Sequence, residues 1–311
     1  MNRTKLSAPY LSIVVPFYNE EENVHRLWQR LRDVVKAYGK SYQVIFVDDG
    51  SSDKTRQFVI DLANQEKAVS AILFRANFGQ SAAMAAGFAH TRGQVVIAMD
   101  GDLQNDPADI PVLVEKLEQG YDVVAGWRKN RKDKLLVRKI PSKIANRIIC
   151  STTGVFLHDT GCSLKAFRGE MLRNISLYGE LHRFIPALMR MEGANITELA
   201  VHHHARKYGK SKYNLTRTFR VILDLTTIRL LMRHLKNPLS FFAAFSFFFL
   251  FSGLVAFSYG FYKVMILDVP FEQVNILLTI TVLLIASGLQ FLFLGLIGRM
   301  VVESGSRRSL Y

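Results

Sequence analysis

Short apolar runs alternate with amphipathic segments as far as about residue 127 of the chain. In the amphipathic segments the apolar side chains recur at the spacing of one face of a helix. Strands that alternate with helices in this way predict a parallel sheet with helices on both of its faces. The expected strands are 11–15, 42–47, 69–74, 94–99, 121–125 and a later one at 196–202, and the expected helices are 24–38, 54–64, 81–90 and 107–120.

The first of these helices carries signals at both ends. Asn19 with Glu22 has the pattern of a capping box, in which two side chains bind backbone N–H groups of the first turn. Gly39 suits the other end, because glycine adopts the left-handed conformation with which many helices stop. A further segment, 134–153, is basic and is also expected to be helical.

Two apolar runs near the C-terminus, 238–262 and 274–298, contain no Asp, Glu, Lys, Arg or His. Each is about 25 residues long, and about 20 apolar residues let a helix cross a bilayer. Before them, 215–237 interleaves apolar and basic residues, which favours an amphipathic helix at the membrane surface; an ordinary surface helix is the alternative. The expected organisation is a globular domain at 1–214, this interfacial helix, two transmembrane helices and a basic tail at 299–311.

Charge indicates how the chain is oriented. It has 40 Lys and Arg residues against 26 Asp and Glu residues, a net charge of +14. Basic residues flank the pair of spans and are scarce between them, so we expect both termini and the globular domain in the cytoplasm, on an inner or plasma membrane. The start of the chain is basic but lacks a cleavage site, so no signal peptide is expected. Two cysteines, Cys150 and Cys162, fit a reducing compartment without excluding one disulfide.

Acidic residues follow the predicted strands, at the edge where ligands bind to open parallel sheets. The chain lacks the G-x-G-x-x-G pattern after its first strand and lacks a complete P-loop, which excludes the two common nucleotide folds. Asp100 and Asp102 repel each other unless a cation lies between them, which favours a divalent metal site over a solvated acidic turn. An EF-hand is excluded, because Asn105 and Pro111 stand where it needs Gly and Glu.

Basic residues complement this acidic edge in two clusters, 128–139 and 206–212. Each cluster alone is compatible with solvated surface charge. Together they favour binding of two kinds of phosphate, one in a donor pyrophosphate and one presented at the bilayer surface, where each basic residue contributes about 1 kcal/mol. No nucleic-acid partner is expected. In the His202–His204 run, neighbouring side chains on a strand point to opposite faces, so a metal site there is not expected.

Several motifs point to a known family. They are Pro16-x-Tyr18-Asn19-Glu20, Val47-Asp48-Asp49-Gly50-Ser51-x-Asp53, Asn77-x-Gly79 with Ala86-Gly87, Asp100-x-Asp102-Leu103-Gln104, Gly126-x-Arg128 and Arg206-x-Tyr208-Gly209-x-Ser211-Lys212-Tyr213. The first four resemble motifs of inverting family 2 glycosyltransferases with the GT-A fold, a Rossmann-like α/β domain with a mostly parallel sheet. The last two are similar to those of the polyprenyl-phosphate glycosyltransferases, which include dolichol-phosphate mannose synthase and bacterial undecaprenyl-phosphate glucosyl and aminoarabinose transferases. The resemblance covers roughly residues 10–215.

The resemblance implies roles for the matched residues. A nucleotide-sugar would contact Pro16, Tyr18, Glu20, Val47, Asp49, Asp100, Gly101, Asp102, Arg128, Arg206 and Lys212. Asp100, Asp102 and Gln104 would bind Mg²⁺ or Mn²⁺, and Arg128, Arg131 and Arg138 would bind the acceptor phosphate. Asp102 and Asp159 are the catalytic candidates, Asp159 either as a general base or as the cap of a turn. Two departures are Arg75, one place earlier than the family's arginine, and Gly101, which replaces the usual alanine and is expected to be harmless.

The implied activity is inverting, metal-dependent transfer of one sugar to undecaprenyl phosphate, from a nucleotide-sugar that is expected to be UDP-linked, with glucose favoured. A phosphate acceptor needs no general base, because it is already largely anionic near pH 7. The alternatives are a 4-amino-arabinose, N-acetylglucosamine or mannose donor, a neutral acceptor such as diacylglycerol, and a membrane-tethered sensor without catalysis. The chain lacks the Gln-x-x-Arg-Trp motif of processive relatives, and association into a homo-oligomer is left open.

Overall fold

The computed structural model describes residues 8–129, 150, 154–173, 175, 177, 179, 181–205 and 238–308. The chain divides into two compact units, one up to Thr226 and one from Thr227 onward. The expected helix at 134–153, apart from residue 150, and the one at 215–237 lie outside the described residues, as do the site candidates Arg131, Arg138, Arg206 and Lys212.

The first unit is built on a seven-stranded sheet with the order β3-β2-β1-β4-β6-β5-β7. The strands are β1 (Leu11–Phe17), β2 (Tyr42–Asp48), β3 (Val69–Leu73), β4 (Val95–Ala98), β5 (Val123–Trp127), β6 (Lys165–Arg168) and β7 (Ile196–Ala200). All neighbouring pairs are parallel except those of β6, which is antiparallel to β4 and to β5. The mostly parallel sheet is confirmed, but the sequence pattern did not predict β6.

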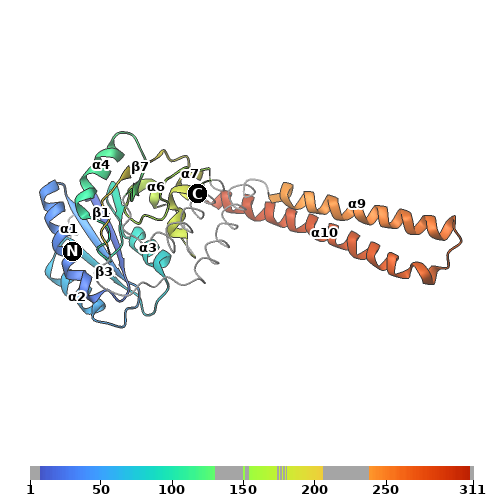
Figure 1. Cartoon of the computed structure of the whole chain (residues 1–311), viewed down its shortest axis with the longest axis horizontal. Helices are drawn as coiled ribbons and strands as arrows, with labels where there is room; N and C mark the ends of the chain where they lie inside the picture. The colour runs from blue at the N-terminus through green and yellow to red at the C-terminus, as the bar shows by residue number, and fades with distance from the viewer. Residues whose placement is uncertain are drawn as a thin grey trace. The chain divides into compact units, whose positions relative to one another are not determined.

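Helices cover both faces of the sheet, as expected (Figure 1). One face packs against α1 (Glu21–Tyr38), α2 (Thr55–Gln65) and α4 (Ile110–Glu118), and the other against α3 (Gln80–Ala89), α6 (Gly169–Leu172) and α7 (Ile185–Met191). Two short 3₁₀ helices, η1 (Pro107–Asp109) and η3 (Leu181–Phe184), precede α4 and α7. Side chains alternate along the buried strands, so that Ile13 and Val15 join one core and Val14 joins the other.

The first end of α1 differs from the predicted cap, and the second end agrees with it. The expected capping box is wrong: the helix begins at Glu21, and Glu20 is its N-cap without a side-chain capping bond. Asn19 instead has a positive φ of 52°, and its Oδ1 accepts a hydrogen bond from Ser52 N at 2.8 Å. The turn after β2 therefore takes the side chain that the helix was expected to use. Gly39 ends the helix in the left-handed conformation, as predicted.

The second unit contains α9 (Pro238–Met265) and α10 (Phe271–Arg308), which lie side by side (Figure 1). Both helices are long and apolar enough to cross a membrane. Large apolar side chains are exposed along both, among them Phe247 at 73% and Val282 at 66%. The expected spans, 238–262 and 274–298, fall within these helices.

Candidate active site

The parallel strands β1, β2, β4 and β5 end at one edge of the sheet, where β6 begins because it runs the other way. The residues expected to bind the donor follow these ends. Pro16 and Val47 face each other across β1 and β2. Tyr18 and Glu20 follow β1, and Glu20 accepts a hydrogen bond from Asn23 Nδ2 at 2.6 Å. The sheet topology thus gathers these candidates at one edge; their contacts with a donor stay a prediction.

Asp49 holds a loop in place. Its Oδ1 accepts a hydrogen bond from Phe78 N at 2.8 Å, and its Oδ2 accepts hydrogen bonds from Gly79 N at 3.0 Å and from Asn77 Nδ2 at 2.9 Å. Asp49 as a whole residue is 3% exposed. The Asn77-x-Gly79 motif is therefore explained by its contacts with Asp49, and this loop leads directly into α3.

The acidic turn after β4 is tightly shaped. Asp100 Oδ1 accepts a hydrogen bond from Gln80 Nε2, the first residue of α3, at 2.6 Å, and Asp102 Oδ1 accepts one from Gln104 N at 3.1 Å. Leu103 within the turn has a positive φ of 61°. The carboxylate and amide oxygens of Asp100, Asp102 and Gln104 are donors of the kind that Mg²⁺ and Mn²⁺ take. Within the described part of the chain, no group of three His, Cys, Asp or Glu residues could hold a metal ion.

Gly101 is matched to its neighbour. A Cβ atom at this position would lie 2.4 Å from Cδ1 and Cε1 of Phe17, whose side chain is 1% exposed. The glycine that stands where the family usually has alanine therefore makes room for this ring. With alanine at position 101, the Phe17 side chain could not keep its present position.

Arg128 and Asp159 form a buried ion pair between the end of β5 and the turn that precedes β6. Arg128 Nε donates to Asp159 Oδ2 at 2.6 Å, and Nη2 donates to Oδ1 at 2.9 Å. The side chains are 14% and 8% exposed. Gly161 N also donates to Oδ1, at 3.2 Å. The two residues were singled out separately from the sequence, and the structure brings them together.

Gly126 lets this turn approach β5. Its N donates to Leu164 O at 2.9 Å, and a Cβ atom would lie 2.7 Å from the same oxygen and 3.0 Å from Cys162 Sγ. Cys162 is fully buried, and burial raises the pKa of its thiol to about 11, so it is a packing residue rather than a thiolate.

Lys165, the first residue of β6, is a functional candidate that the sequence did not reveal. It pairs with Ala98 of β4 and with Ala125 of β5, and it is 3% exposed. Its Nζ donates to the carbonyl oxygens of Thr160, at 3.5 Å, and of Cys162. Burial lowers its pKa, while the nearby Cys162, Asp159 and Asp100 act in the opposite direction. A buried lysine therefore lies between the ends of β4 and β5, at the edge of the sheet that carries Asp100 and Arg128.

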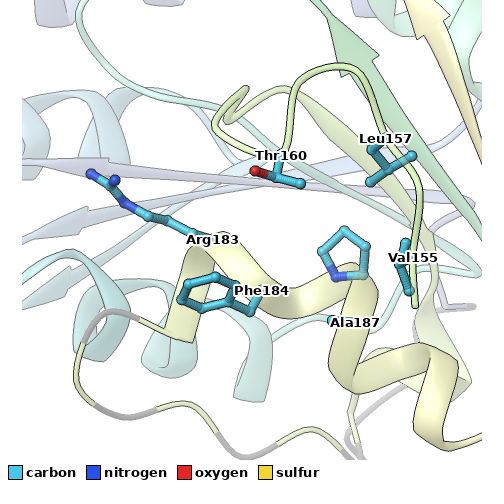
Figure 2. A pocket seen from close by; sticks show the side chains of 7 residues that line it. Val155, Leu157, Thr160, Arg183, Phe184 and Ala187 are labelled. Atoms are coloured by element: carbon cyan, nitrogen blue, oxygen red, sulfur yellow. The ribbon is translucent and has the colours of Figure 1, made fainter. Parts of the chain in front are cut away.

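A second unforeseen contact joins η3 to the start of α3. His182 Nδ1 lies 2.7 Å from Ser81 Oγ, and His182 N donates to the same oxygen at 3.2 Å. Beside η3, an apolar recess is lined by Val155, Leu157, Thr160, Arg183, Phe184, Pro186 and Ala187. Figure 2 shows Thr160 and Leu157 on one side of the recess and Phe184 and Ala187 on the other. The segment that carries Asp159 thus packs on η3 and α7.

The histidine run after β7 binds carboxylates. His202 Nδ1 lies 2.7 Å from Asp109 Oδ1, and His204 Nε2 lies 2.8 Å from Asp106 Oδ2. The hydrogen bond with Asp109 raises the pKa of His202. Burial alone would raise the pKa of Asp106, but hydrogen bonds from His204 and Ala108 outweigh it and lower that pKa. These pairs fasten the chain after β7 to the segment that follows the acidic turn.

Comparison with known proteins agrees with this geometry. Residues 12–183 match the family described as Glycosyl transferase family 2. The chain belongs to this family. A curated relative from Rhizobium johnstonii, dodecaprenyl-phosphate galacturonate synthase, is 47% identical over 241 residues, which are 75% of this chain and 70% of the relative. The family 2 chain is therefore a glycosyltransferase, and the expected enzyme class is confirmed.

Solved structures similar to this glycosyltransferase support the GT-A fold. Glucosyl-3-phosphoglycerate synthase from Mycobacterium tuberculosis, in complex with Mn²⁺, UDP and phosphoglyceric acid, matches with a TM-score of 0.56 and 18% identity, over 71% of this chain and 78% of that one. The same protein with Mn²⁺, UDP-glucose and phosphoglyceric acid gives a TM-score of 0.54 and 19% identity, over 71% and 80%. At this identity the likeness is one of fold.

Proposed function

We propose that this glycosyltransferase transfers one sugar from a UDP-sugar to a polyprenyl phosphate at the cytoplasmic face of a membrane. The observation that carries the proposal is the 47% identity to a protein named for a polyprenyl-phosphate product, over an alignment longer than the family match itself. The two long apolar helices support it, because they suit a protein whose acceptor is a membrane lipid.

The sugar is proposed to be galacturonate or a close relative of it. The glucose favoured from sequence resemblance has no support in the curated relative, whose name specifies galacturonate. UDP as the nucleotide is supported only by the fold neighbours that contain it.

Asp100, Asp102 and Gln104 would hold Mg²⁺ or Mn²⁺ beside the donor. A divalent ion bound there would neutralise charge on the pyrophosphate as the nucleotide leaves. The hydrogen bond from Gln80 fixes one oxygen of Asp100, and the backbone bond from Gln104 fixes one oxygen of Asp102. The two carboxylates are therefore held in place by the chain itself.

Arg128 is proposed to bind phosphate, and Asp159 is proposed to orient the guanidinium group of Arg128. Arg128 donates through both Nε and Nη2 to the carboxylate, so the plane of the guanidinium is fixed at the site edge. Both oxygens of Asp159 accept hydrogen bonds, from Arg128 and from Gly161, which supports an orienting role over that of a general base.

The reaction would be a single in-line displacement. An oxygen of the acceptor phosphate attacks the anomeric carbon, the bond from that carbon to the nucleoside diphosphate breaks, and the configuration inverts. No proton needs to be removed, because the acceptor's second pKa is about 6 and its oxygen is anionic at neutral pH. Positioning and neutralisation of charge then account for the rate.

The topology and the basic residues would place the two substrates together. With both termini and the glycosyltransferase domain in the cytoplasm, the cationic segments 128–139 and 206–212 would be on the side of the membrane that carries the anionic leaflet, as the positive-inside rule favours. Of these, only Arg128 and Lys129 lie in the described part of the chain.

A donor and acceptor panel tests the proposal. The full-length protein is incubated with Mn²⁺ and undecaprenyl phosphate, and separately with diacylglycerol, together with the UDP forms of galacturonate, galactose, glucose, glucuronate or N-acetylglucosamine. Mass spectrometry should detect a galacturonosyl product of the polyprenyl phosphate, and Asp102→Asn should not form it. A product only with diacylglycerol, or none with any donor, would reject the proposed acceptor; a glucosyl product alone would reject the proposed sugar.

A further inference from the structure

A buried lysine, Lys165, binds the backbone of the turn that carries Asp159. Lys165 Nζ donates to the carbonyl oxygens of Thr160 and Cys162, which lie one and three residues after Asp159. Because β6 is antiparallel, its first residue lies at the same edge as the ends of β4 and β5. Lys165 thus reaches the turn from within the sheet.

The same lysine lies close to the acidic turn. Lys165 pairs with Ala98, two residues before Asp100, and directly paired residues place their side chains on one face of a sheet. That face is the one covered by α3, from which Gln80 binds Asp100. Electrostatic interactions of Lys165 with Asp100 and with Asp159 follow from this arrangement.

The contacts suit an ammonium group. Both hydrogen-bond partners of Nζ are carbonyl oxygens, which only accept, and the nearby ionised groups include two carboxylates. Asp159 and Asp100 are among the groups that oppose the effect of burial on the pKa of Lys165. A buried charge with such partners is tolerated where an isolated one is not.

We propose that Lys165 is a positioning residue of the glycosyltransferase site, which holds the 159–163 turn under Arg128 and supplies the buried positive charge that favours the donor pyrophosphate. The inference rests on the proposed function, since it requires a nucleoside diphosphate donor. It also assigns a role to β6, whose sequence carries no motif. The first residue of β6 lies at the edge of the sheet where β4 and β5 end.

Three substitutions separate the two parts of this role. Lys165→Arg keeps both the charge and the donors, Lys165→Gln keeps N–H donors without charge, and Lys165→Met keeps neither. Lys116→Met is the matched control: its Nζ binds Gln119 Oε1 at 2.9 Å near the end of α4, and α4 leads into the start of β5 at the opposite edge of the sheet.

The readout is the ratio of the affinities for UDP and UMP, measured by calorimetry on the full-length protein with Mn²⁺. Removing a nearby charge should lower this ratio about tenfold in Lys165→Gln and in Lys165→Met, because UDP carries the phosphate charge that UMP lacks. Lys165→Arg and Lys116→Met should keep the wild-type ratio. Thermal unfolding should show Lys165→Met less stable than Lys165→Gln, since only Met leaves two buried carbonyls without donors.

Equal weakening of UDP and UMP binding, or an unchanged ratio in Lys165→Gln, would overturn the inference and leave Lys165 as a structural residue. If Lys165→Met does not fold, Lys165→Gln still decides. A wild-type protein that binds neither nucleotide would instead reject the proposed UDP donor, and with it the role of Lys165 at a pyrophosphate.

Discussion

Replacing Asp159 with asparagine removes the charge that faces Arg128 and leaves the shape of the turn unchanged. In the wild type, the two side chains are 14% and 8% exposed and share hydrogen bonds of 2.6 and 2.9 Å. Losing one partner of a buried ion pair costs about 3–5 kcal/mol, because the other charge is left buried without compensation. Since Arg128 keeps some contact with water, we expect the lower end of this range, about 3 kcal/mol.

Tryptophan fluorescence during urea unfolding measures this loss of unfolding free energy in the unit that contains the ion pair. The two tryptophans, Trp28 and Trp127, both lie in the glycosyltransferase domain, and Trp127 directly precedes Arg128. Arg128→Met and the double variant complete a double-mutant cycle with Asp159→Asn. The double variant should lose less unfolding free energy than the two single variants lose in sum, because it removes both charges.

Activity of the same variant separates the two roles considered for Asp159. If it orients Arg128, Asp159→Asn raises the KM for the acceptor and leaves the pH dependence of kcat unchanged. If it is a general base, kcat loses its acidic limb. An unfolding midpoint of Asp159→Asn equal to that of the wild type, together with additive single losses, would refute the ion pair as described.

Two further substitutions test contacts around the site. Gly101→Ala should destabilise the domain by about 1–3 kcal/mol in urea unfolding, because its Cβ would lie 2.4 Å from the buried ring of Phe17, and a second change, Phe17→Leu, should recover part of the loss; an unaltered midpoint would contradict this packing. The pKa of His202 is raised above 6.5 by its bond with Asp109, so this contact stabilises the fold below about pH 6.5 and loses its effect as pH rises through the raised pKa. His202→Gln should therefore lower the unfolding midpoint at about pH 5.5 and not at about pH 9; an equal effect at both would argue against the charged pair.

Local patterns predicted most elements of this fold. The strands β1 to β5 and β7 and the helices α1 to α4 follow from apolar periodicity, whereas α6 and α7 were not predicted, and Gly39 ends α1 as its chemistry requires. The capping box failed because Asn19 has two potential partners, and the turn after β2, which the sequence pattern does not place beside it, takes the side chain.

β6 was missed for a related reason. It has four residues, begins with a buried lysine and ends with an arginine, so neither its length nor its polarity indicates a strand in the middle of a sheet. Lys165 becomes interpretable only when β4 and β5 are placed on either side of it.

The site shows the same division between motif and contact. Motifs identified Asp49 and Arg128, but the partners that fix them in position come from distant segments. The loop at 77–79 holds Asp49, and the turn before β6 holds Arg128. Gln80 and His182 carry no recognisable motif, because their importance depends on the tertiary contacts with Asp100 and Ser81.

The strand order also dictates how the chain can assemble as it leaves the ribosome. β1 to β4 find all their mutual neighbours once residue 98 has emerged, whereas the partners of β5 among the described strands, β6 and β7, both come later. Until β6 is synthesised, β5 has no neighbouring strand in the sheet, and the nascent domain holds only the paired strands β1 to β4. A chain truncated before β6 would therefore keep four paired strands, β1 to β4. It would contain Arg128, but β5, which precedes Arg128, would have no strand through which to join the sheet.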